Sequence, residues 1–561
     1  FRSSHLLKKE MTMGSQRRLL IANRGEIALR IIRTAQESGF HTVAIYPKDD
    51  EASLHVRRAD EAVRLSGVGP AAYLDIDEIT SIAVATNCQM VHPGYGFLSE
   101  SGSFVRSIEK TGIVFVGPTA EQMELFGNKS AACNYAREKT IPVLGSSATF
   151  KSCDEFVKLF ENSVPRKPHI IKAVSGGGGR GMRVVRIGDD IRKLWDQAEA
   201  EALTAFGDGR LYAEEYCDVA RHIEVQVVGD GQGNVTHLWE RDCSLQRRHQ
   251  KLVEITPAPS LDSGLRKKLL DAAVSLATEV QYRGIGTFEF LVDVETSNYF
   301  FIEANPRLQV EHTITEEVLG LDLICIQFEI ALGRSLENLS LLTPPPIKGT
   351  ALQLRINAEK MNEDGKISSV GGVVSQFEPS AGPGVRVDTA AHNLYTMHPS
   401  FDSLLAKLII YSHGSDQQKL LTKAGRVLSE FVIDGLPTNR SLISALVKRP
   451  EIALGKVTTG FVEENWESLF SASEKLPKKQ RTDADEVKES TTTSIPEGLR
   501  AAKAPMRGSI ISIDVEIGEI VSSGQQLGLL EAMKMHHEII AIDSGVVSDI
   551  LSELGDVVDE R

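Results

Sequence analysis

Leu530-Glu531-Ala532-Met533-Lys534-Met535 is a short stretch near the end of the 561-residue chain, with one lysine between two methionines. It separates two similar segments, 508–521 and 545–558, whose glycines and terminal valine recur 37 residues later. The alternating Ile and Val residues of these segments predict two strand–turn–strand units that pack on one another. The stretch between them is therefore predicted to form an exposed hairpin with Lys534 at its tip.

The simplest interpretation of Lys534 is an ordinary surface lysine on a hairpin. However, Ala532-Met533-Lys534-Met535, centred within a repeat, resembles the biotin-attachment sequence of biotinyl carrier domains. The resemblance implies that a biotin protein ligase attaches biotin to the ε-amine of Lys534, and that the surrounding domain is a small all-β flattened barrel. Lipoyl carrier domains share this fold but usually lack the methionine pair, so they are the near alternative.

The composition of the chain excludes several classes of protein. A chain of 561 residues is too long for one hydrophobic core, so three or four domains are expected. The 62 basic and 76 acidic residues give a net charge of −14, and no long basic run interrupts the sequence. We therefore expect no nucleic-acid partner, and no apolar run is long enough to predict a membrane span.

The cysteines and the first residues bear on the cellular compartment. Six scattered cysteines without a CxxC pair favour neither a disulfide framework nor a zinc site, so a reducing compartment is expected: cytoplasm or mitochondrial matrix, not secretion. Phe1 to Arg18 contain five Lys or Arg, three Ser and one acidic residue, which fits the remainder of a mitochondrial presequence. Met11 or Met13 fits equally well as the true start, so both alternatives stay open.

An α/β domain is predicted at the beginning of the chain. Arg18-Leu19-Leu20-Ile21-Ala22 reads as a buried strand, Glu26 to Ser38 have helical spacing that ends at Gly39, and residues 42–46 read as the next strand. This βαβ unit predicts a parallel sheet. A Rossmann dinucleotide site is not predicted, because Asn23-Arg24-Gly25-Glu26 lacks the required glycines at the first turn.

A glycine-rich hairpin is predicted in the middle of the chain. Strands are expected at residues 170–174 and 182–186, and Ser175, four glycines and Arg180 lie between them. A P-loop would continue into a helix and end in Gly-Lys-Ser/Thr, so this run is a different device. Its bare amides favour a lid over phosphates, with a plain flexible loop as the alternative. Lys172 and Arg180 favour an anionic ligand.

Two carboxylates are predicted to face each other in a second hairpin. Residues 287–292 and 299–303 read as neighbouring strands, and antiparallel pairing places Glu289 nearly opposite Glu303. Asn305 lies on the same face as Glu303. Two carboxylates in an apolar hairpin repel one another, so a divalent cation is their natural partner. The all-oxygen ligand set predicts Mg²⁺, or Mn²⁺ in its place, and does not indicate zinc.

Taken together, these motifs resemble biotin carboxylase of the ATP-grasp superfamily over residues 16–466. The motifs are Lys172 with its glycine run, Gln246-Arg247-Arg248-His249-Gln250-Lys251, the Glu289/Glu303 pair and Asn305-Pro306-Arg307-Leu308-Gln309-Val310-Glu311-His312. The resemblance implies a mixed α/β and α+β fold. Its expected parts are a parallel-sheet N-terminal domain (16–130), an ATP-grasp domain (131–332), a C-terminal biotin carboxylase domain (349–466), a flexible linker (467–497) and the all-β biotinyl domain (498–561).

The biotinyl repeat also predicts that the chain continues. The counterpart of residues 527–530, shifted by the same 37 residues, would fall just past Arg561. Without that strand, the sheet of the first copy would keep an unpaired apolar edge. At least one further β-strand is therefore expected, so the biotinyl domain is expected to be truncated at its C-terminus.

The resemblance implies a role for each matching residue. ATP would be bound by Lys129, Lys172, Gly178, Gly179, Glu214 to Cys217, His222, Gln246, His249 and Glu289. The metal would be bound by Glu289, Glu303 and Asn305, and bicarbonate by Lys251, Arg307, Gln309, Val310 and Glu311. Glu311 would be the general base, and Arg355 would face the ureido oxygen of biotin. The expected catalytic set is therefore Lys251, Arg307, Glu311 and Arg355.

Several functions stay open from the sequence. The leading hypothesis is the biotin carboxylase and carrier portion of an acyl-CoA carboxylase, which works with a carboxyltransferase subunit or downstream domain and forms a homodimer or larger oligomer. Pyruvate carboxylase is disfavoured because the linker lacks room for the carboxyltransferase that it places between the two domains, yet pyruvate and urea types remain alternatives. A non-biotin ATP-grasp ligase would not need Lys534, and an inactive scaffold would not need the intact charged residues.

Overall fold

The computed structural model describes the chain in the ranges 17–145, 147, 149–162, 167–174, 181–363, 365–475, 499–505, 508–532 and 535–558. These residues belong to two compact units, which lie within Phe1–Leu476 and Pro477–Arg561. Gly178, Gly179, Lys534 and most of the expected linker lie outside the described residues. Within the described ranges, no helix combines the length and the apolar character needed to cross a membrane.

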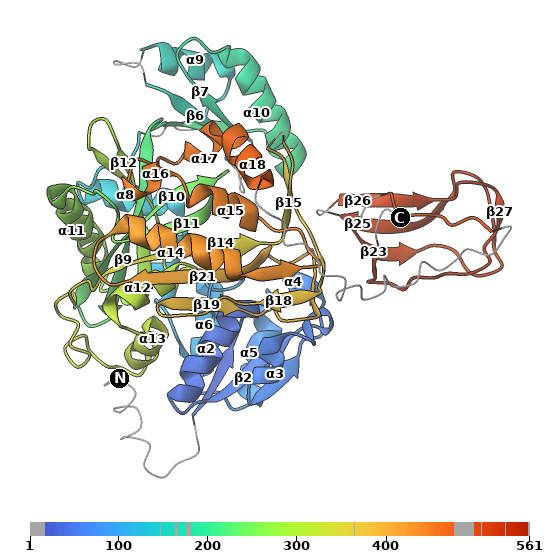
Figure 1. Ribbon diagram of the computed structural model, residues 1–561, viewed down its shortest axis with the longest axis horizontal. Helices are drawn as coiled ribbons and strands as arrows, with labels where there is room; N and C mark the ends of the chain where they lie inside the picture. Colours follow the sequence, from blue (N-terminus) through green and yellow to red (C-terminus); the bar gives the residue numbers. More distant parts are fainter. Residues whose placement is uncertain are drawn as a thin grey trace. The chain divides into compact units, whose positions relative to one another are not determined.

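A parallel sheet begins the first unit, in the region drawn in blue in Figure 1. Its strand order is β3-β2-β1-β4-β5. Helix α2 follows β1 and buries Ile27, Ile31 and Ile32 in the same core as Leu19 and Ile21 of that strand. The predicted βαβ unit is confirmed. The elements are β1 (Arg18–Ile21), α2 (Gly25–Glu37), β2 (His41–Tyr46), η1 (Lys48–Asp50), α3 (Leu54–Arg58), β3 (Glu61–Arg64), α4 (Gly69–Ala72), α5 (Ile76–Ala85), β4 (Met90–His92), α6 (Gly102–Lys110), β5 (Val114–Phe115) and α7 (Ala120–Gly127).

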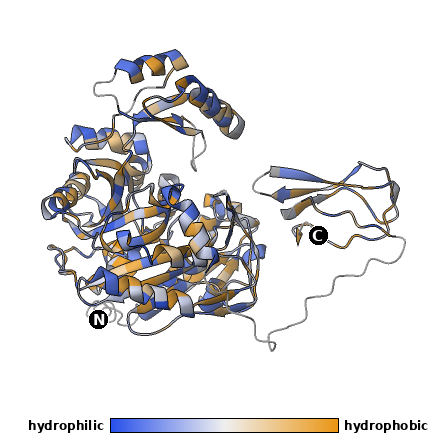
Figure 2. Ribbon diagram, turned by 45° about the horizontal axis from the view of Figure 1, so that its top comes forward, coloured by the Kyte–Doolittle hydropathy of each residue, from blue (hydrophilic) through white to orange (hydrophobic). Residues whose placement is uncertain are grey.

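An eight-stranded antiparallel sheet forms the centre of the unit, in the order β13-β12-β9-β10-β11-β14-β21-β19. Apolar residues, orange in Figure 2, run along its strands. The strands are β9 (Ala220–Asp230), β10 (Val235–Arg247), β11 (Gln250–Thr256), β12 (Arg283–Asp293), β13 (Tyr299–Asn305), β14 (Thr350–Asn357), β19 (Val385–Thr389) and β21 (Leu404–Ser412). Among the helices that contact them are α8 (Lys129–Glu138), α11 (Ser263–Glu279), α12 (His312–Leu319) and α13 (Leu323–Ala331).

This sheet crosses the expected boundary between the ATP-grasp and C-terminal domains. Strand β11 pairs with β14, which joins Val253 to Leu354 and Glu254 to Gln353 in register. The two sequence regions were expected as separate domains, but their strands share one hydrogen-bonded ladder. The pairing also brings the side chain of Arg355, on β14, next to residues of the ATP-grasp region.

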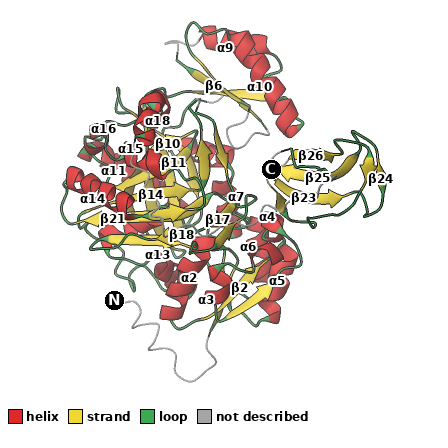
Figure 3. Cartoon of the chain, turned by 45° about the vertical axis from the view of Figure 1, so that its right-hand side comes forward, coloured by secondary structure: helices red, strands yellow, loops and turns green. Residues whose placement is uncertain are grey.

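A smaller sheet with the order β7-β6-β8 carries Lys172. Helices α9 and α10 cover it (Figure 3), and Phe156, Ile171 and Trp195 share its core. The strands predicted at residues 170–174 and 182–186 are confirmed. The elements are α9 (Cys153–Asn162), β6 (His169–Ala173), β7 (Met182–Val185), α10 (Ile191–Phe206) and β8 (Leu211–Glu215).

The end of the first unit differs from expectation at two places. The single strand expected at residues 370–377 is two strands, because β17 pairs with β20 whereas β18 pairs with β22. Residues 467–474, expected in the linker, lie in helix α18, whose Leu469 is buried in the core. The elements are β15 (Glu359–Met361), β16 (Ile367–Ser369), β17 (Gly372–Val374), β18 (Gln376–Glu378), β20 (Tyr395–Met397), α14 (Gln417–Glu430), β22 (Val432–Asp434), α15 (Arg440–Leu446), α16 (Pro450–Ala453), α17 (Phe461–Glu464) and α18 (Trp466–Glu474).

The second unit is all-β, and its register confirms the predicted repeat. Gly508 of the first copy pairs with Val558 of the second. In the same way, Gly545 of the second copy pairs with Val521 of the first. The hairpin of β25 and β26 pairs as far as Ala532 and Met535. The strands are β23 (Gly508–Ile513), β24 (Ile520–Val521), β25 (Gln526–Ala532), β26 (Met535–Ile540), β27 (Gly545–Val546) and β28 (Val557–Val558).

The central sheet leads to a prediction about stability. A Cβ added to Gly286, on β12, would lie 2.3 Å from the hydroxyl oxygen of Tyr282, whose ring is fully buried. We expect Gly286→Ala to lower the free energy of unfolding by about 1–3 kcal/mol because the site is overpacked. Gly425→Ala is the matched control, since nothing lies within 4 Å of the added Cβ in α14 and it should stabilise by about 0.5–1 kcal/mol. Urea unfolding of both variants tests this; equal effects would contradict it.

Candidate active site

The predicted site residues lie on neighbouring strands of the central sheet. Glu289 on β12 is in register with Glu303 on β13 and with Glu224 on β9. Residues directly opposite one another in a ladder point to the same face, so three carboxylates meet there. The predicted register of Glu289 and Glu303 is confirmed. Glu224 and Glu289 are buried whereas Glu303 is partly exposed, and the buried negative charge requires cations close by.

Lys251, on β11, is the cation that contacts the most carboxylates. Its Nζ donates to Glu224 Oε2 at 2.6 Å, to Glu311 Oε1 at 2.7 Å and to Glu289 Oε1 at 3.2 Å. Burial disfavours the ammonium, but the attraction of Glu224, Glu289 and Glu311 is stronger and raises the pKa of Lys251 well above its usual value. Lys251 therefore stays protonated throughout the physiological range.

Glu311 lies between two cations, one for each carboxylate oxygen. Oε1 accepts from Lys251, and Oε2 accepts from Arg355 Nη2 at 3.0 Å. Burial alone would raise the pKa of Glu311, but Lys251, Arg355 and Arg241 hold it well below its usual value. Glu311 is therefore an ionised carboxylate, which is the form that can accept a proton.

Glu254 was not predicted as a site residue, yet it holds Arg355 from the other side. Arg355 Nε donates to Glu254 Oε1 at 2.5 Å, so one guanidinium joins Glu254 to Glu311. Burial raises the pKa of Glu254, Arg355 opposes this, and Glu311 adds to it, so the net shift is upward. The two carboxylates that share Arg355 thus have pKa values moved in opposite directions.

Glu224 and Arg241 were also missed. Both are fully buried, and Arg241 Nε donates to Glu224 Oε1 at 2.5 Å. The remaining donors of Arg241 reach Gln226 at 2.8 Å, Thr315 at 3.0 Å and Thr287 at 3.2 Å. A sequence signal was available, because polar residues alternate with apolar ones along β9, from His222 to Val227. Polar alternation in a strand buried on both faces indicates an internal polar site.

The expected metal ligands form an oxygen-rich group. Asn305 Nδ2 donates to Glu289 Oε1 at 2.7 Å, and Glu303 lies 3.8 Å from Lys129 Nζ. Carboxylate and amide oxygens are the ligands that Mg²⁺ prefers, so this set fits that ion. Ligand atoms of His222, Glu224 and Glu289 also lie within 4.8 Å of one another. That second group needs no ion, because Arg241 and Lys251 already neutralise Glu224.

Lys172 and Glu214 meet on the small sheet, where they form an ion pair. Burial and the nearby Lys129 lower the pKa of Lys172, and Glu214 opposes them. Two lysines, Lys129 and Lys172, are therefore within electrostatic reach of each other, as expected for residues that share one anionic ligand.

The other predicted ATP residues lie nearby in the fold. His249 is at the β10–β11 turn, and burial, together with Lys172, Lys129 and His222, lowers its pKa against the opposing effect of Glu463. His222 Nε2 hydrogen-bonds Glu289 Oε2 at 2.5 Å, and Gln246 is buried on β10. Cys217 Sγ lies 3.6 Å from Asp293 Oδ2, and burial and Asp293 raise the pKa of this thiol to about 12. Cys217 is therefore a protonated, unreactive thiol at neutral pH.

Arg307 links the segment that was expected to bind bicarbonate to two other parts of the unit. Its Nε donates to Glu100 at 2.5 Å, and its Nη atoms donate to Gln309 Oε1 and Asn305 Oδ1, each at 3.2 Å. Gln309 Nε2 in turn lies 3.4 Å from Glu289 Oε1. The structure thus brings Lys251, Arg307, Gln309 and Glu311 into one hydrogen-bonded network. Gly178, Gly179 and Lys534 lie outside the described residues.

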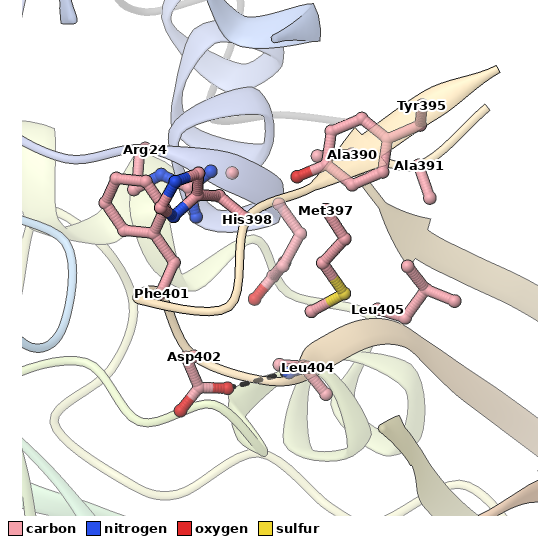
Figure 4. Close-up of a pocket in the computed structure, with 12 residues that line it drawn as sticks. Arg24, Ala390, Ala391, Tyr395, Met397, His398, Phe401, Asp402, Leu404 and Leu405 are labelled. Atoms are coloured by element: carbon pink, nitrogen blue, oxygen red, sulfur yellow. Dashed lines mark hydrogen bonds between the residues drawn. The ribbon is translucent and has the colours of Figure 1, made fainter. Parts of the chain in front are cut away.

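A separate small cavity of about 30 Å³ lies between the start of α2 and residues 390–405 (Figure 4). The side chains around it include Arg24, Met397, His398 and Phe401. The Cζ atom of Arg24 lies 3.8 Å from the ring centroid of Phe401. A cavity of this size admits one or two waters and neither a nucleotide nor biotin. It is therefore not the substrate site.

Four family models match the chain in sequence. Their descriptions are biotin carboxylase, N-terminal domain (residues 15–123), carbamoyl-phosphate synthase L chain, ATP binding domain (128–339), biotin carboxylase C-terminal domain (353–464) and biotin-requiring enzyme (501–560). The predicted fold class is confirmed: a parallel-sheet domain, an ATP-grasp domain, a C-terminal biotin carboxylase domain and an all-β biotinyl domain.

Relatives of two kinds share the first unit. The chain is 42% identical over 451 residues to the biotin carboxylase of Nostoc sp., which covers 80% of this chain and 98% of that protein. It is 43% identical over 477 residues to the pyruvate carboxylase of Aspergillus terreus, which covers 83% of this chain and 39% of that protein. The chain therefore spans about two fifths of the length of that pyruvate carboxylase.

Solved structures agree with this relationship. A biotin carboxylase domain of a single-chain bacterial carboxylase matches with a TM-score of 0.71 at 43% identity, over 82% of this chain and 99% of that one. A single-chain, multi-domain long-chain acyl-CoA carboxylase matches with a TM-score of 0.71 at 37% identity, over 97% of this chain and 50% of that one. The biotin carboxylase domain dimer of Hydrogenobacter thermophilus 2-oxoglutarate carboxylase was solved with MgADP and bicarbonate. It matches with a TM-score of 0.74 at 36% identity, over 82% of this chain and 99% of that one.

The two carboxylates that share Arg355 predict opposite effects of pH on stability. The pKa of Glu311 is lowered by folding, so its ionised form stabilises the fold above its unfolded pKa of about 4.3, and this stability is lost as the pH falls. The stability advantage of the wild type over Glu311→Gln should therefore shrink by about 1 kcal/mol between pH 7 and pH 3.5.

For Glu254 the sign is reversed, because its pKa is raised by folding. The wild type should lose stability relative to Glu254→Gln as the pH rises above about 4.3. Urea unfolding at several pH values measures both differences. Parallel pH trends for the two variants would contradict this assignment of charge.

Proposed function

Because the chain belongs to the biotin carboxylase family and also contains a biotinyl domain, we propose that it uses ATP and bicarbonate to carboxylate biotin attached to Lys534. The observation that carries the proposal is the position of Glu311, a buried carboxylate held between Lys251 and Arg355. In the proposed reaction bicarbonate loses a proton and receives a phosphoryl group from ATP. A proton acceptor beside two fixed cations suits this reaction, because both reactants are anions.

In this proposal Lys251, Arg307, Gln309 and the main chain of Val310 bind bicarbonate, and Glu311 takes its proton. The free enzyme holds Glu311 in a weakly basic state, because two cations lower its pKa. A bicarbonate ion that accepts hydrogen bonds from Lys251 competes with Glu311 for that cation. Substrate binding therefore raises the basicity of Glu311 at the moment when a base is needed.

ATP would bind to Lys129, Lys172, Gly178, Gly179, Glu214, Cys217, His222, Gln246, His249 and Glu289. Glu289, Glu303 and Asn305 would hold Mg²⁺, which neutralises charge on the transferred phosphoryl group when it is bound. The chain's own lysines add positive charge on the same anion, and Lys172 enters the site from the small sheet, separately from the metal ligands. Charge neutralisation from two sides suits transfer of the γ-phosphoryl group to bicarbonate to give carboxyphosphate.

Arg355 has the second role in the site. Its guanidinium stays charged at all relevant pH values and is fixed between Glu254 and Glu311. Carboxyphosphate yields CO₂ and phosphate, and the phosphate can remove the N1 proton of biotin. Arg355 would stabilise the negative charge that then develops on the ureido oxygen.

The carboxyl acceptor that we propose is an acyl-CoA, reached through a carboxyltransferase subunit or downstream domain. The similarity to the long-chain acyl-CoA carboxylase supports this, since it extends over 97% of the chain and so includes both units. The relatives named pyruvate carboxylase make pyruvate the alternative acceptor. We also propose a homodimer, in analogy to the 2-oxoglutarate carboxylase domain dimer. The proposed location is the cytoplasm or the mitochondrial matrix, and a human relative named mitochondrial pyruvate carboxylase, 42% identical over 454 residues, supports the latter.

The direct test is ATP hydrolysis that depends on bicarbonate and free biotin, together with a streptavidin blot of the purified chain. We expect both to be positive. Hydrolysis that ignores bicarbonate, or an amine-dependent reaction in its place, would overturn the proposal in favour of another ATP-grasp ligase.

Lys534→Ala should abolish the streptavidin signal and transfer to any acyl-CoA, while carboxylation of free biotin remains intact. The reason is that Lys534 belongs to the second compact unit, whereas Lys251, Glu311 and Arg355 belong to the first. Lys503→Ala, another lysine of the second unit, is the control and should change nothing. Equal loss of both activities in a folded Lys534→Ala protein would refute this division of labour.

Glu311→Gln should lower bicarbonate-dependent turnover roughly a hundredfold or more, which is the usual scale for a lost general base. ATP binding should persist, because Lys129 and Lys172 are unchanged. Turnover is followed by phosphate release, and ATP binding by equilibrium dialysis. Near-normal turnover would remove Glu311 from the mechanism.

A further inference from the structure

The segment from Arg307 to Glu311 connects β13 to α12 without regular secondary structure, yet it carries much of the proposed bicarbonate site. Val310 has an apolar side chain, so it can bind an anion only through its main-chain N–H. Among the described residues, this N–H has no hydrogen-bond acceptor, which leaves it available to a ligand. The direction in which it points therefore matters for binding.

His312 holds the peptide group that contains this N–H through two of its own groups, the first being its main-chain N–H, which donates to the Gln309 carbonyl oxygen at 3.3 Å. Its Nδ1 lies 2.7 Å from the carbonyl oxygen of Gln309, and the imidazole is fully buried. Burial and the cations Lys407, Arg30 and Arg386 hold the pKa of His312 well below its usual value, so the ring is neutral. Because a carbonyl only accepts, we assign the single ring proton to Nδ1.

Lys407, on β21, fixes the next peptide group. Its Nζ donates to the carbonyl oxygen of Val310 at 3.2 Å and lies 3.0 Å from Glu26 and 3.8 Å from Asp388. Glu26 also accepts from the hydroxyl of Tyr95, and the lysine side chain is fully buried. Lys407 is therefore held by carboxylates from α2 and β19 and cannot swing away from the carbonyl.

Because the peptide bond is planar, these two contacts also fix the directions of the Val310 and Glu311 N–H groups. In a planar trans peptide the C=O and the following N–H point in opposite directions. The Gln309 carbonyl directed toward His312 aims the Val310 N–H away from it, and the Val310 carbonyl directed toward Lys407 does the same for the Glu311 N–H. We propose that His312 and Lys407 are positioning residues that aim these two amides at bicarbonate, an inference that rests on the proposed function.

A purely structural role for the two residues makes a different prediction. If they only fill space and balance charge, removing them would lower stability and reduce the affinity for ATP and bicarbonate together. If they aim the amides, bicarbonate affinity alone should change, and a smaller side chain that keeps the donor should preserve it. Asn places an amide N–H close to the position of His Nδ1, whereas Leu has a similar volume without a donor.

The experiment compares His312→Asn, His312→Leu and the charge-balanced double variant Lys407→Met/Glu26→Gln in bicarbonate-dependent ATP hydrolysis with free biotin. Lys423→Met is the matched control, because Lys423 also donates to a main-chain carbonyl, that of Tyr411, at 2.8 Å. We expect the KM for bicarbonate to rise roughly tenfold in His312→Leu and in the double variant, with the KM for ATP within about twofold of wild type. His312→Asn should stay close to wild type.

The outcomes separate this inference from the proposed function. A wild-type protein without bicarbonate-dependent hydrolysis would refute the proposed function itself. An active wild type with His312→Leu equal to His312→Asn, or with both KM values rising together in folded variants, would overturn the positioning role alone. Thermal unfolding of every variant identifies those that fail to fold, and the double variant then tests the same segment from the opposite side.

Discussion

The contact of one buried ammonium, Lys251, with Glu224, Glu289 and Glu311 is the interaction on which the site depends. Removing four charges from water is tolerable only if each is compensated at hydrogen-bond distance. The antiparallel sheet supplies that compensation, because β9, β11 and β12 bring residues distant in sequence to one face in fixed register. The charged site therefore depends on the register of the sheet. A shift of one residue in any of these strands would turn its charged side chain to the other face.

Local patterns were sufficient to predict the pairs that lie on consecutive strands. Glu289 and Glu303 are separated by one turn, so two apolar strands in the sequence determine their register, which the ladder confirms. Glu254 and Arg355 come from β11 and β14, and no local pattern states that these strands are neighbours. The same holds for Lys407, which lies in an apolar strand and reaches the Val310 carbonyl only through the tertiary fold. The sequence therefore predicted which residues pair in the site only where the two residues lie on strands that are consecutive in the chain.

The continuous sheet explains why two expected domains share one site. The family resemblance implied a domain boundary between residues 332 and 349, but β14 continues the ladder started by β11. As a result Arg355 contacts both Glu254 on β11 and Glu311 before α12. Two independent domains would leave the distance between Arg355 and Glu311 dependent on their relative motion. A shared ladder fixes it, and the low pKa of Glu311, which Lys251 and Arg355 together maintain, depends on such fixed distances.

The second unit differs from the first in what its strands support, because its task in the proposed reaction is to present one side chain. Its cross-strand pairs Gly508–Val558 and Val521–Gly545 are related by the internal repeat, because the first strand of each copy pairs with the last strand of the other copy. The β25–β26 hairpin lies between the two copies in sequence and pairs as far as Ala532 and Met535, on either side of Met533 and Lys534. The small core of this unit contains Ala504, Ile510 and Leu530, and the last two lie on the paired strands β23 and β25. In the proposed reaction, this paired and partly buried pair of strands would hold the hairpin whose sequence contains the proposed attachment residue, Lys534.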